Sequence, residues 1–145
     1  MTTVSATRTL SAPPTAVRSA IVERPREFVA AAGFDEVRAD GDTFSVAREL
    51  GLATIELTVR LDRDAAAALA FEAVEGIFDH MRTEYVVTAT EGGSRVTAET
   101  TFSLGGIAGA ALDATLVARQ RRREFEDQFD YLAATLAPSG EDLDR

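Results

Sequence analysis

The stretch TIELTVRLD, residues 54–62, decides the fold class of this 145-residue chain. Apolar side chains (Ile55, Leu57, Val59 and Leu61) alternate in it with polar or charged ones. A period of two places successive side chains on opposite faces of a strand, so one face is predicted to be buried and the other to meet water. This pattern is typical of an antiparallel sheet that is covered on one side only.

Strands with the same alternation are predicted on both sides of this stretch. They cover residues 5–10, 34–39, 43–49, 65–75, 81–90 and 96–104. Turns that contain glycine separate several of them, as at residues 40–42 and 92–93. The segment 65–75 opens with four alanines, which favour a helix, but the alternation from Leu69 to Ala73 favours a strand. We therefore expect seven strands, the last six joined in hairpin sequence.

Helices are predicted in three places. Pro14 and Pro25 each suit the first turn of a short helix, and Gly33 suits the end of the second one. A long helix is predicted over residues 110–137, and residues 138–145 have the composition of a frayed acidic tail. Nothing indicates an internal repeat or a linker, so residues 1–145 are expected to form one domain.

Composition narrows the classes of function. The chain carries 24 acidic residues and 15 basic ones, all of them arginine, which gives a formal net charge of −9. This balance opposes binding to nucleic acid and to an anionic membrane surface. The absence of cysteine excludes disulfides and cysteine-ligated metals, and no apolar stretch has the roughly 18 residues that a membrane span needs. Since the N-terminus shows no signal-peptide pattern, we expect a cytoplasmic protein without membrane insertion.

The complete absence of lysine and asparagine has two interpretations. One is a GC-rich genome, because the codons of both residues are rich in A. The other is adaptation to a salt-rich, halophilic cytoplasm, where strong screening weakens the repulsion among abundant carboxylates. The acidic balance favours the second interpretation, and the first stays open.

The order of elements resembles a known family. One strand, two short helices, six strands in hairpin sequence and a long terminal helix are expected in the helix-grip fold of the START / Bet v 1-like (SRPBCC) superfamily, in particular its polyketide cyclase/dehydrase-like members. The resemblance covers nearly the whole chain and is carried by APPTAV at 12–17, GFDEV at 33–37, EGGSRVT at 91–97, and Phe125, Phe129 and Leu132. It implies an α+β fold in which a curved antiparallel sheet of seven strands wraps around the C-terminal helix.

The resemblance also implies a cavity between the sheet and the long helix that takes hydrophobic molecules. The expected ligand-binding residues are the inward positions Phe44, Leu57, Val59, Phe71, Tyr85, Val87, Thr100, Phe102, Phe125 and Phe129, with Arg122 at the mouth. Such a lining suits an apolar ligand, because removing apolar area from water contributes about 25 cal/mol per Å². The alternative is that these side chains form a closed, packed core.

Few polar groups are expected near this cavity. Tyr85 can offer its hydroxyl to a ligand, act as an acid or simply pack as a core ring, and alternation extended backwards places Asp79 beside it. His80 points outward on the same alternation, and without a second histidine or a cysteine it predicts no metal site. The inward stripe of the long helix, projected backwards, runs through Arg121 and Arg122, so Arg122 is expected to meet an acidic ligand head.

The resemblance, taken with these residues, implies three possible functions. The first is non-catalytic binding of a small hydrophobic or lipid-like molecule, with no cofactor. The second is a polyketide cyclase/dehydratase-like enzyme that uses Tyr85, Asp79 or Arg122 for proton transfer or enolate stabilisation. The third is an interaction module with a vestigial cavity. Because Leu112 and Leu116 face away from the inward stripe, the N-terminal half of the long helix either bends or packs against a second subunit, as in a homodimer.

Overall fold

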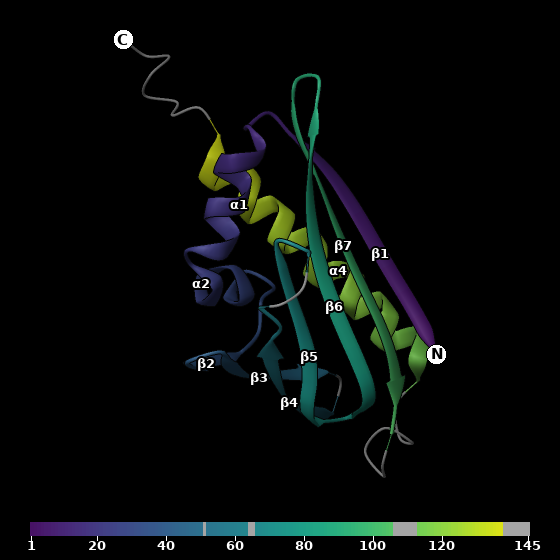
Figure 1. Ribbon diagram of the computed structural model, residues 1–145. Helices are drawn as coiled ribbons and strands as arrows, with labels where there is room; N and C mark the ends of the chain where they lie inside the picture. The colour runs from purple at the N-terminus through teal and green to yellow at the C-terminus, as the bar shows by residue number, and fades with distance from the viewer. Residues whose placement is uncertain (51, 64–65, 106–112, 138–145) are drawn as a thin grey trace.

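Seven antiparallel strands form one sheet in the order β1-β7-β6-β5-β4-β3-β2. The computed structural model describes residues 1–50, 52–63, 66–105 and 113–137. The strands are β1 (Thr2–Leu10), β2 (Glu36–Asp40), β3 (Thr43–Leu50), β4 (Ala53–Leu61), β5 (Leu69–Gly76), β6 (Phe78–Thr90) and β7 (Gly93–Leu104). The helices are α1 (Pro14–Val22), α2 (Pro25–Ala30) and α4 (Ala114–Leu136). Figure 1 shows α4 lying diagonally across one face of the twisted sheet, with α1 and α2 beside its C-terminal half.

The predicted fold class is confirmed, and most strand boundaries agree with the alternation. Each strand from β2 onward pairs with the next one along the chain, while β1 closes the far edge by pairing with β7. The strand predicted over 65–75 begins only at Leu69, so the alanine-rich segment before it forms neither a strand nor a helix among the described residues. β1, β6 and β7 each begin three residues earlier than predicted, at Thr2, Phe78 and Gly93, and β2 begins two residues later, at Glu36.

The helices begin where the sequence indicates. Pro14 and Pro25 occupy the first turns of α1 and α2, where the missing N–H has no partner to lose. Gly33 follows α2 with φ +92°, a conformation that glycine adopts without a steric penalty. α4 is capped by Asp113, whose carboxylate accepts from the Thr115 N–H at 2.7 Å. The predicted start of the long helix at residue 110 and the predicted tail 138–145 lie outside the described residues.

The core lies between the inner face of the sheet and the three helices. Phe125, Phe129 and Leu132 of α4 are completely buried, as the inward stripe predicts. Each such side chain stabilises the fold by about 1.5–3 kcal/mol relative to its exposed state. Leu116 is 40% exposed, so it faces away from the sheet as expected. No described helix is long and apolar enough to cross a membrane.

The pairing register of the sheet shifts at two places. The register of β4 against β5 shifts between Thr58 and Val59, and that of β6 against β7 shifts between Phe78 and His80. A bulge inserts an unpaired residue, which increases the local twist and changes the side to which the neighbouring side chains point. Both bulges therefore affect which residues reach the space under the sheet.

Candidate functional site

A small cavity lies between α4 and strands β3 to β6. It has two lobes of about 40 Å³ each, which share the side chains of Phe34, Val46, Leu57 and Arg121. The α4 lobe is otherwise lined by Arg48, Ile55, Ile77, Phe78, Val117, Gln120 and Glu124. The α2 lobe is otherwise lined by Val29, Ala32, Val59, Phe71, Met81, Thr83, Tyr85 and Gln128. The cavity is thus mostly apolar, with a few convergent polar groups.

Three charged side chains meet at the α4 lobe. Glu124 accepts from Arg48 Nε at 3.0 Å with one carboxylate oxygen and from Arg121 Nη1 with the other. The side chains of Glu124, Arg121 and Arg48 are only 5%, 12% and 16% exposed. Arg48 also donates to the backbone oxygen of Ala32 at 2.9 Å. Because moving charges out of water costs free energy, the burial of these three side chains depends on their pairing with one another.

Arg121 lines both lobes, and one of its three nitrogens has no hydrogen-bond partner among the described residues. Its Nη2 donates to Thr83 Oγ1 at 2.9 Å, and its guanidinium carbon lies 5.0 Å from the centre of the Phe125 ring. Its Nε is buried and has no hydrogen-bond partner among the described residues. A buried donor without a partner costs about 1–3 kcal/mol, so this atom is available to an acceptor that enters the cavity.

A second polar group lines the α2 lobe. The Tyr85 hydroxyl donates to Gln128 Oε1 at 2.7 Å, and Gln128 Nε2 donates to the Phe28 backbone oxygen at 3.1 Å. Burial raises the pKa of Tyr85 to about 12, although the nearby Arg121 charge and the bond to Gln128 act against this rise. The hydroxyl is therefore neutral at physiological pH, and its proton is already engaged.

The sequence-predicted lining residues divide into two groups. Leu57, Val59, Phe71 and Tyr85 do line the cavity. The other inward residues of the prediction are buried but pack in the core outside both lobes: Phe44, Val87, Thr100, Phe102, Phe125 and Phe129. The inward direction was predicted correctly for all of them, but alternation cannot tell a core position from a cavity wall.

Arg122 is placed differently from the prediction. It is exposed, and its Nη1 donates to the Ser5 backbone oxygen of β1 at 3.2 Å. Successive helix residues are 100° apart, and the buried face of α4 runs through Arg121 and Glu124. The prediction that Arg122 overhangs the cavity is therefore wrong, and Arg121 holds that position.

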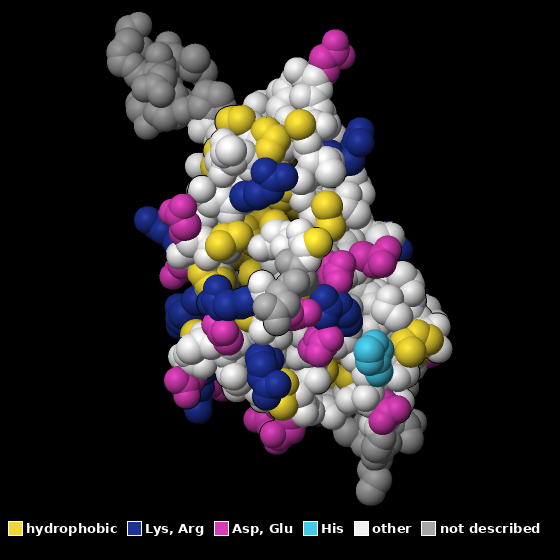
Figure 2. Space-filling view, viewed as in Figure 1, with side chains coloured by type: hydrophobic (Ala, Val, Ile, Leu, Met, Phe, Trp, Pro, Cys, Tyr) yellow, Lys and Arg dark blue, Asp and Glu magenta, His cyan; other side chains and the backbone are white. Residues whose placement is uncertain are grey.

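Asp79 is also placed outside the cavity. The bulge between Phe78 and His80 adds one residue to β6, which breaks the alternation on which the prediction rested. Asp79 is exposed as a result, and His80, which the alternation already places outward, is exposed as well. Figure 2 shows His80, the chain's single histidine, on the molecular surface, as the alternation predicted. No group of side chains suited to a metal ion occurs among the described residues.

Arg48, Glu124 and Gln128 are cavity residues that the sequence interpretation missed. A signal for each is present in the sequence. Arg48 has the same phase as Phe44 and Val46 in β3, and Glu124 and Gln128 follow Arg121 at intervals of three and four along α4. Polar side chains on a buried phase of a strand or helix are uncommon, because their burial requires partners.

Comparisons with known proteins agree on the architecture. No family model matches the chain, and no curated protein matches its sequence. Among solved structures, the Thermus thermophilus protein TTHA0849 aligns with 94% of this chain and 100% of its own, at a TM-score of 0.69 and 19% identity. The Zhui aromatase/cyclase from Streptomyces sp. R1128 aligns with 96% of this chain and 98% of its own, at a TM-score of 0.67 and 16% identity. A START superfamily protein from Mycobacterium smegmatis aligns with 92% of this chain and 96% of its own, at a TM-score of 0.63 and 11% identity.

The chain has the helix-grip fold. The sheet, the two short helices after β1 and the long α4 correspond to the arrangement that the START / Bet v 1-like resemblance implies. At these identities the similarity establishes the fold alone. The chemistry of the helix-grip cavity must be derived from its own residues.

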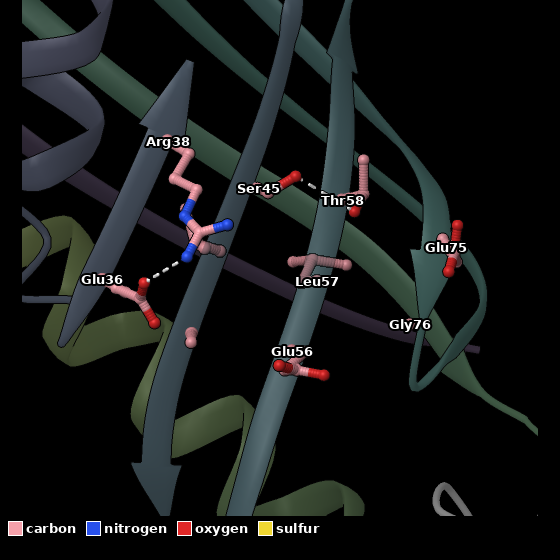
Figure 3. A pocket seen from close by; sticks show the side chains of 10 residues that line it. Glu36, Arg38, Ser45, Glu56, Leu57, Thr58, Glu75 and Gly76 are labelled. Atoms are coloured by element: carbon pink, nitrogen blue, oxygen red, sulfur yellow. Dashed lines mark hydrogen bonds and ion pairs between the residues drawn. The ribbon is translucent and has the colours of Figure 1, made fainter. Parts of the chain in front are cut away.

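A second hollow, of about 260 Å³, lies on the opposite face of the sheet. Figure 3 shows it over β2 to β5, with the Arg38–Glu36 ion pair on one side and Glu75 on the other. The Arg38 and Glu36 side chains are 80% and 61% exposed, at a separation of 2.9 Å. Exposed ion pairs of this kind contribute little to stability, and the largely exposed side chains of Arg38 and Glu36 show that this edge of the hollow meets solvent.

Proposed function

We propose that this protein binds a small apolar ligand in the helix-grip cavity between the sheet and α4. The observation that carries the proposal is the cavity itself: two lobes that share four lining side chains, with mostly apolar walls and a few buried polar groups. A concave, mostly apolar space with convergent polar groups is the usual form of a small-molecule site. Similarity in fold to an aromatase/cyclase and to a START superfamily protein is compatible with such a site.

The size of the cavity limits the ligand. Each lobe of about 40 Å³ has room for only a few water-sized molecules, since one water needs roughly 10–15 Å³ of such space. A short-chain or single-ring compound fits if the two lobes act together. A longer, lipid-like ligand requires side chains that line both lobes, such as Phe34 and Leu57, to move apart.

The small volume also supports a second candidate function. An interaction module with a vestigial cavity would keep the helix-grip fold and fill the space under the sheet with side chains. The enzyme hypothesis has less support. Asp79 and Arg122 are exposed, and the Tyr85 hydroxyl is neutral and already donates a hydrogen bond to Gln128. We therefore favour binding over catalysis.

Calorimetric titration with neutral n-alcohols from butanol to octanol tests the proposal. We expect saturable binding of one molecule per chain, with an optimum at a short chain length. Val117→Phe fills the α4 lobe and should abolish binding, because Val117 lines that lobe and is 4% exposed. Leu116→Phe is the matched control, since the neighbouring Leu116 is 40% exposed and faces away from the cavity.

The outcome separates the two candidates. Binding by the parent chain and Leu116→Phe, but not by Val117→Phe, supports the ligand-binding function. If no alcohol binds at any salt concentration, or if Val117→Phe binds as well as Leu116→Phe, the cavity is not the site and the interaction module becomes the better account.

A further inference from the structure

We infer that the ligand of this cavity is a small apolar acid, bound as a monoanion with its charged head at Arg121. This inference rests on the proposed function and adds the chemical class of the ligand. It is drawn from the charges, donors and walls of the two lobes.

The charged side chains that line the lobes do not balance. They are Arg48, Arg121 and Glu124, so two positive charges face one negative charge and leave an excess of +1. Buried charges are stable when they are paired, and an excess charge under the sheet lacks the water that would compensate it at the surface. A ligand with a single negative charge makes this group neutral.

Arg121 has the geometry to receive such a head. Two of its nitrogens are used, by Glu124 and by Thr83, while its Nε has no partner among the described residues. The guanidinium donors lie in one plane, and a carboxylate or a phenolate oxygen accepts from them in charge-assisted bonds. The unpaired Nε–H of Arg121 can therefore donate to the anionic head of the ligand, whose charge also balances the excess positive charge.

The remaining groups near Arg121 do not repel an anion. Thr83, Tyr85 and Gln128 carry no charge, and the Tyr85 hydroxyl keeps its proton because burial raises its pKa to about 12. Glu124 is the one carboxylate that lines the cavity among the described residues, and both of its oxygens are bound to arginines. The apolar part of the acid then lies in the α4 lobe against the side chains of Ile55, Ile77 and Val117.

The test compares ligands that differ only in their head. Hexanoate, hexanamide and 1-hexanol are titrated calorimetrically at neutral pH and about 0.15 M salt, where the Debye length of about 8 Å limits the effect of the chain's net charge of −9. We expect the parent chain to bind hexanoate at least about tenfold more tightly than hexanamide. Hexanoate is the charged member of the set, and the other two match its length.

Three variants locate the charge effect. Arg121→Met should weaken hexanoate binding about tenfold to a hundredfold and change hexanamide binding less than about twofold. Glu124→Gln raises the excess charge to +2 and should strengthen hexanoate binding. Arg122→Ala removes a neighbouring but exposed arginine of the same helix, so it should leave both ligands unaffected.

Each outcome bears on one of the two proposals. If hexanamide binds as tightly as hexanoate, or if Arg121→Met weakens both equally, the acid inference is wrong and the binding function stands. If Arg121→Met does not fold, Glu124→Gln decides, since an unchanged ratio of hexanoate to hexanamide affinity contradicts the inference. If none of the three compounds binds, the proposed function itself fails.

Discussion

The hydroxyl of Tyr85 is held neutral by its surroundings, and this has a measurable pH dependence. An unfolded chain releases a tyrosine proton near pH 10, whereas the folded protein holds that of Tyr85 to about pH 12. Between these values the folded state binds more protons than the unfolded state, so its stability falls as the pH rises, by up to about 1.4 kcal/mol per pH unit. Below pH 10 this group adds no pH dependence.

Tyrosinate absorbance measures this directly in a Tyr131→Phe variant, in which Tyr85 is the remaining tyrosine. We expect a titration midpoint near 12 while circular dichroism still shows a folded protein. A midpoint near 10 would show that the ring is exposed to solvent, and the α2 lobe would then be open.

Removal of the same hydroxyl should also cost stability. Tyr85→Phe leaves Gln128 Oε1 buried without its donor, which is expected to lower the free energy of unfolding by about 1–3 kcal/mol. Chemical denaturation of the two proteins at neutral pH measures the difference. A variant as stable as the parent would contradict the hydrogen bond between Tyr85 and Gln128.

The sequence predicts some of the cavity residues and misses others for physical reasons. Alternation correctly turns Leu57, Phe71 and Tyr85 inward, because a strand with one buried face has a strict period of two. It fails at Asp79, because a bulge that adds one residue reverses the phase and leaves no trace in the hydrophobic pattern. The helical periodicity of α4, for its part, cannot distinguish Arg121 from Arg122, since a shift of one helix position exchanges the buried arginine for the exposed one.

At the scale of elements, the β6–β7 hairpin depends on one of its two glycines. A Cβ on Gly93 would lie 2.1 Å from the Leu10 backbone oxygen, whereas a Cβ on Gly92 would meet nothing within 4 Å. Gly93→Ala should therefore push the hairpin away from the end of β1 and destabilise the fold by about 1–3 kcal/mol or more. Gly92→Ala should change stability by less than about 0.5 kcal/mol.

Thermal or denaturant unfolding of the two alanine variants checks this prediction. They carry the same chemical change at adjacent positions, so a difference between them reports the contact with β1 and not the turn composition. Equal stability of the two variants would contradict the close approach of the hairpin to Leu10.

The elements themselves were largely predictable from the sequence. Seven alternating segments, two early prolines and one long apolar stripe leave few arrangements in which every apolar face is covered. The position of residues 65–68 between strands predicts that they belong to a strand, but the β5–β6 ladder begins at Leu69, the residue that pairs with Tyr85. The homodimer through the N-terminal half of α4 stays a prediction, as does the assignment of residues 1–145 to one domain.

At the scale of the whole molecule, charge repulsion should make the stability depend on salt. The net charge of −9 acts across the fold at low ionic strength, where the Debye length is about 30 Å at 0.01 M. At molar salt that length shrinks to about 3 Å, and excluded salts also strengthen apolar burial. We expect the melting temperature to rise steadily from dilute buffer to molar KCl.

Salt also weakens the attraction within surface ion pairs, which lowers the stability and opposes the expected rise in melting temperature. Arg82 lies within 3.0 Å of Asp62, 2.7 Å of Glu72 and 2.8 Å of Glu84, and salt weakens such half-exposed pairs. A flat or falling melting temperature would mean that these pairs outweigh the repulsion. The missing lysines would then reflect GC-biased codon usage and not salt adaptation.

Methyl NMR tests most directly whether a small apolar ligand enters the space between the sheet and α4. Hexanoate is titrated into the protein while the methyl signals of Val46, Leu57 and Val117, which line the cavity, are followed beside those of Val74 and Val86, which are 49% and 40% exposed. We expect saturable shifts at the three cavity residues with one common affinity, and none at Val74 and Val86. Shifts at the two exposed valines alone, or no shifts at all, would contradict ligand entry into the cavity.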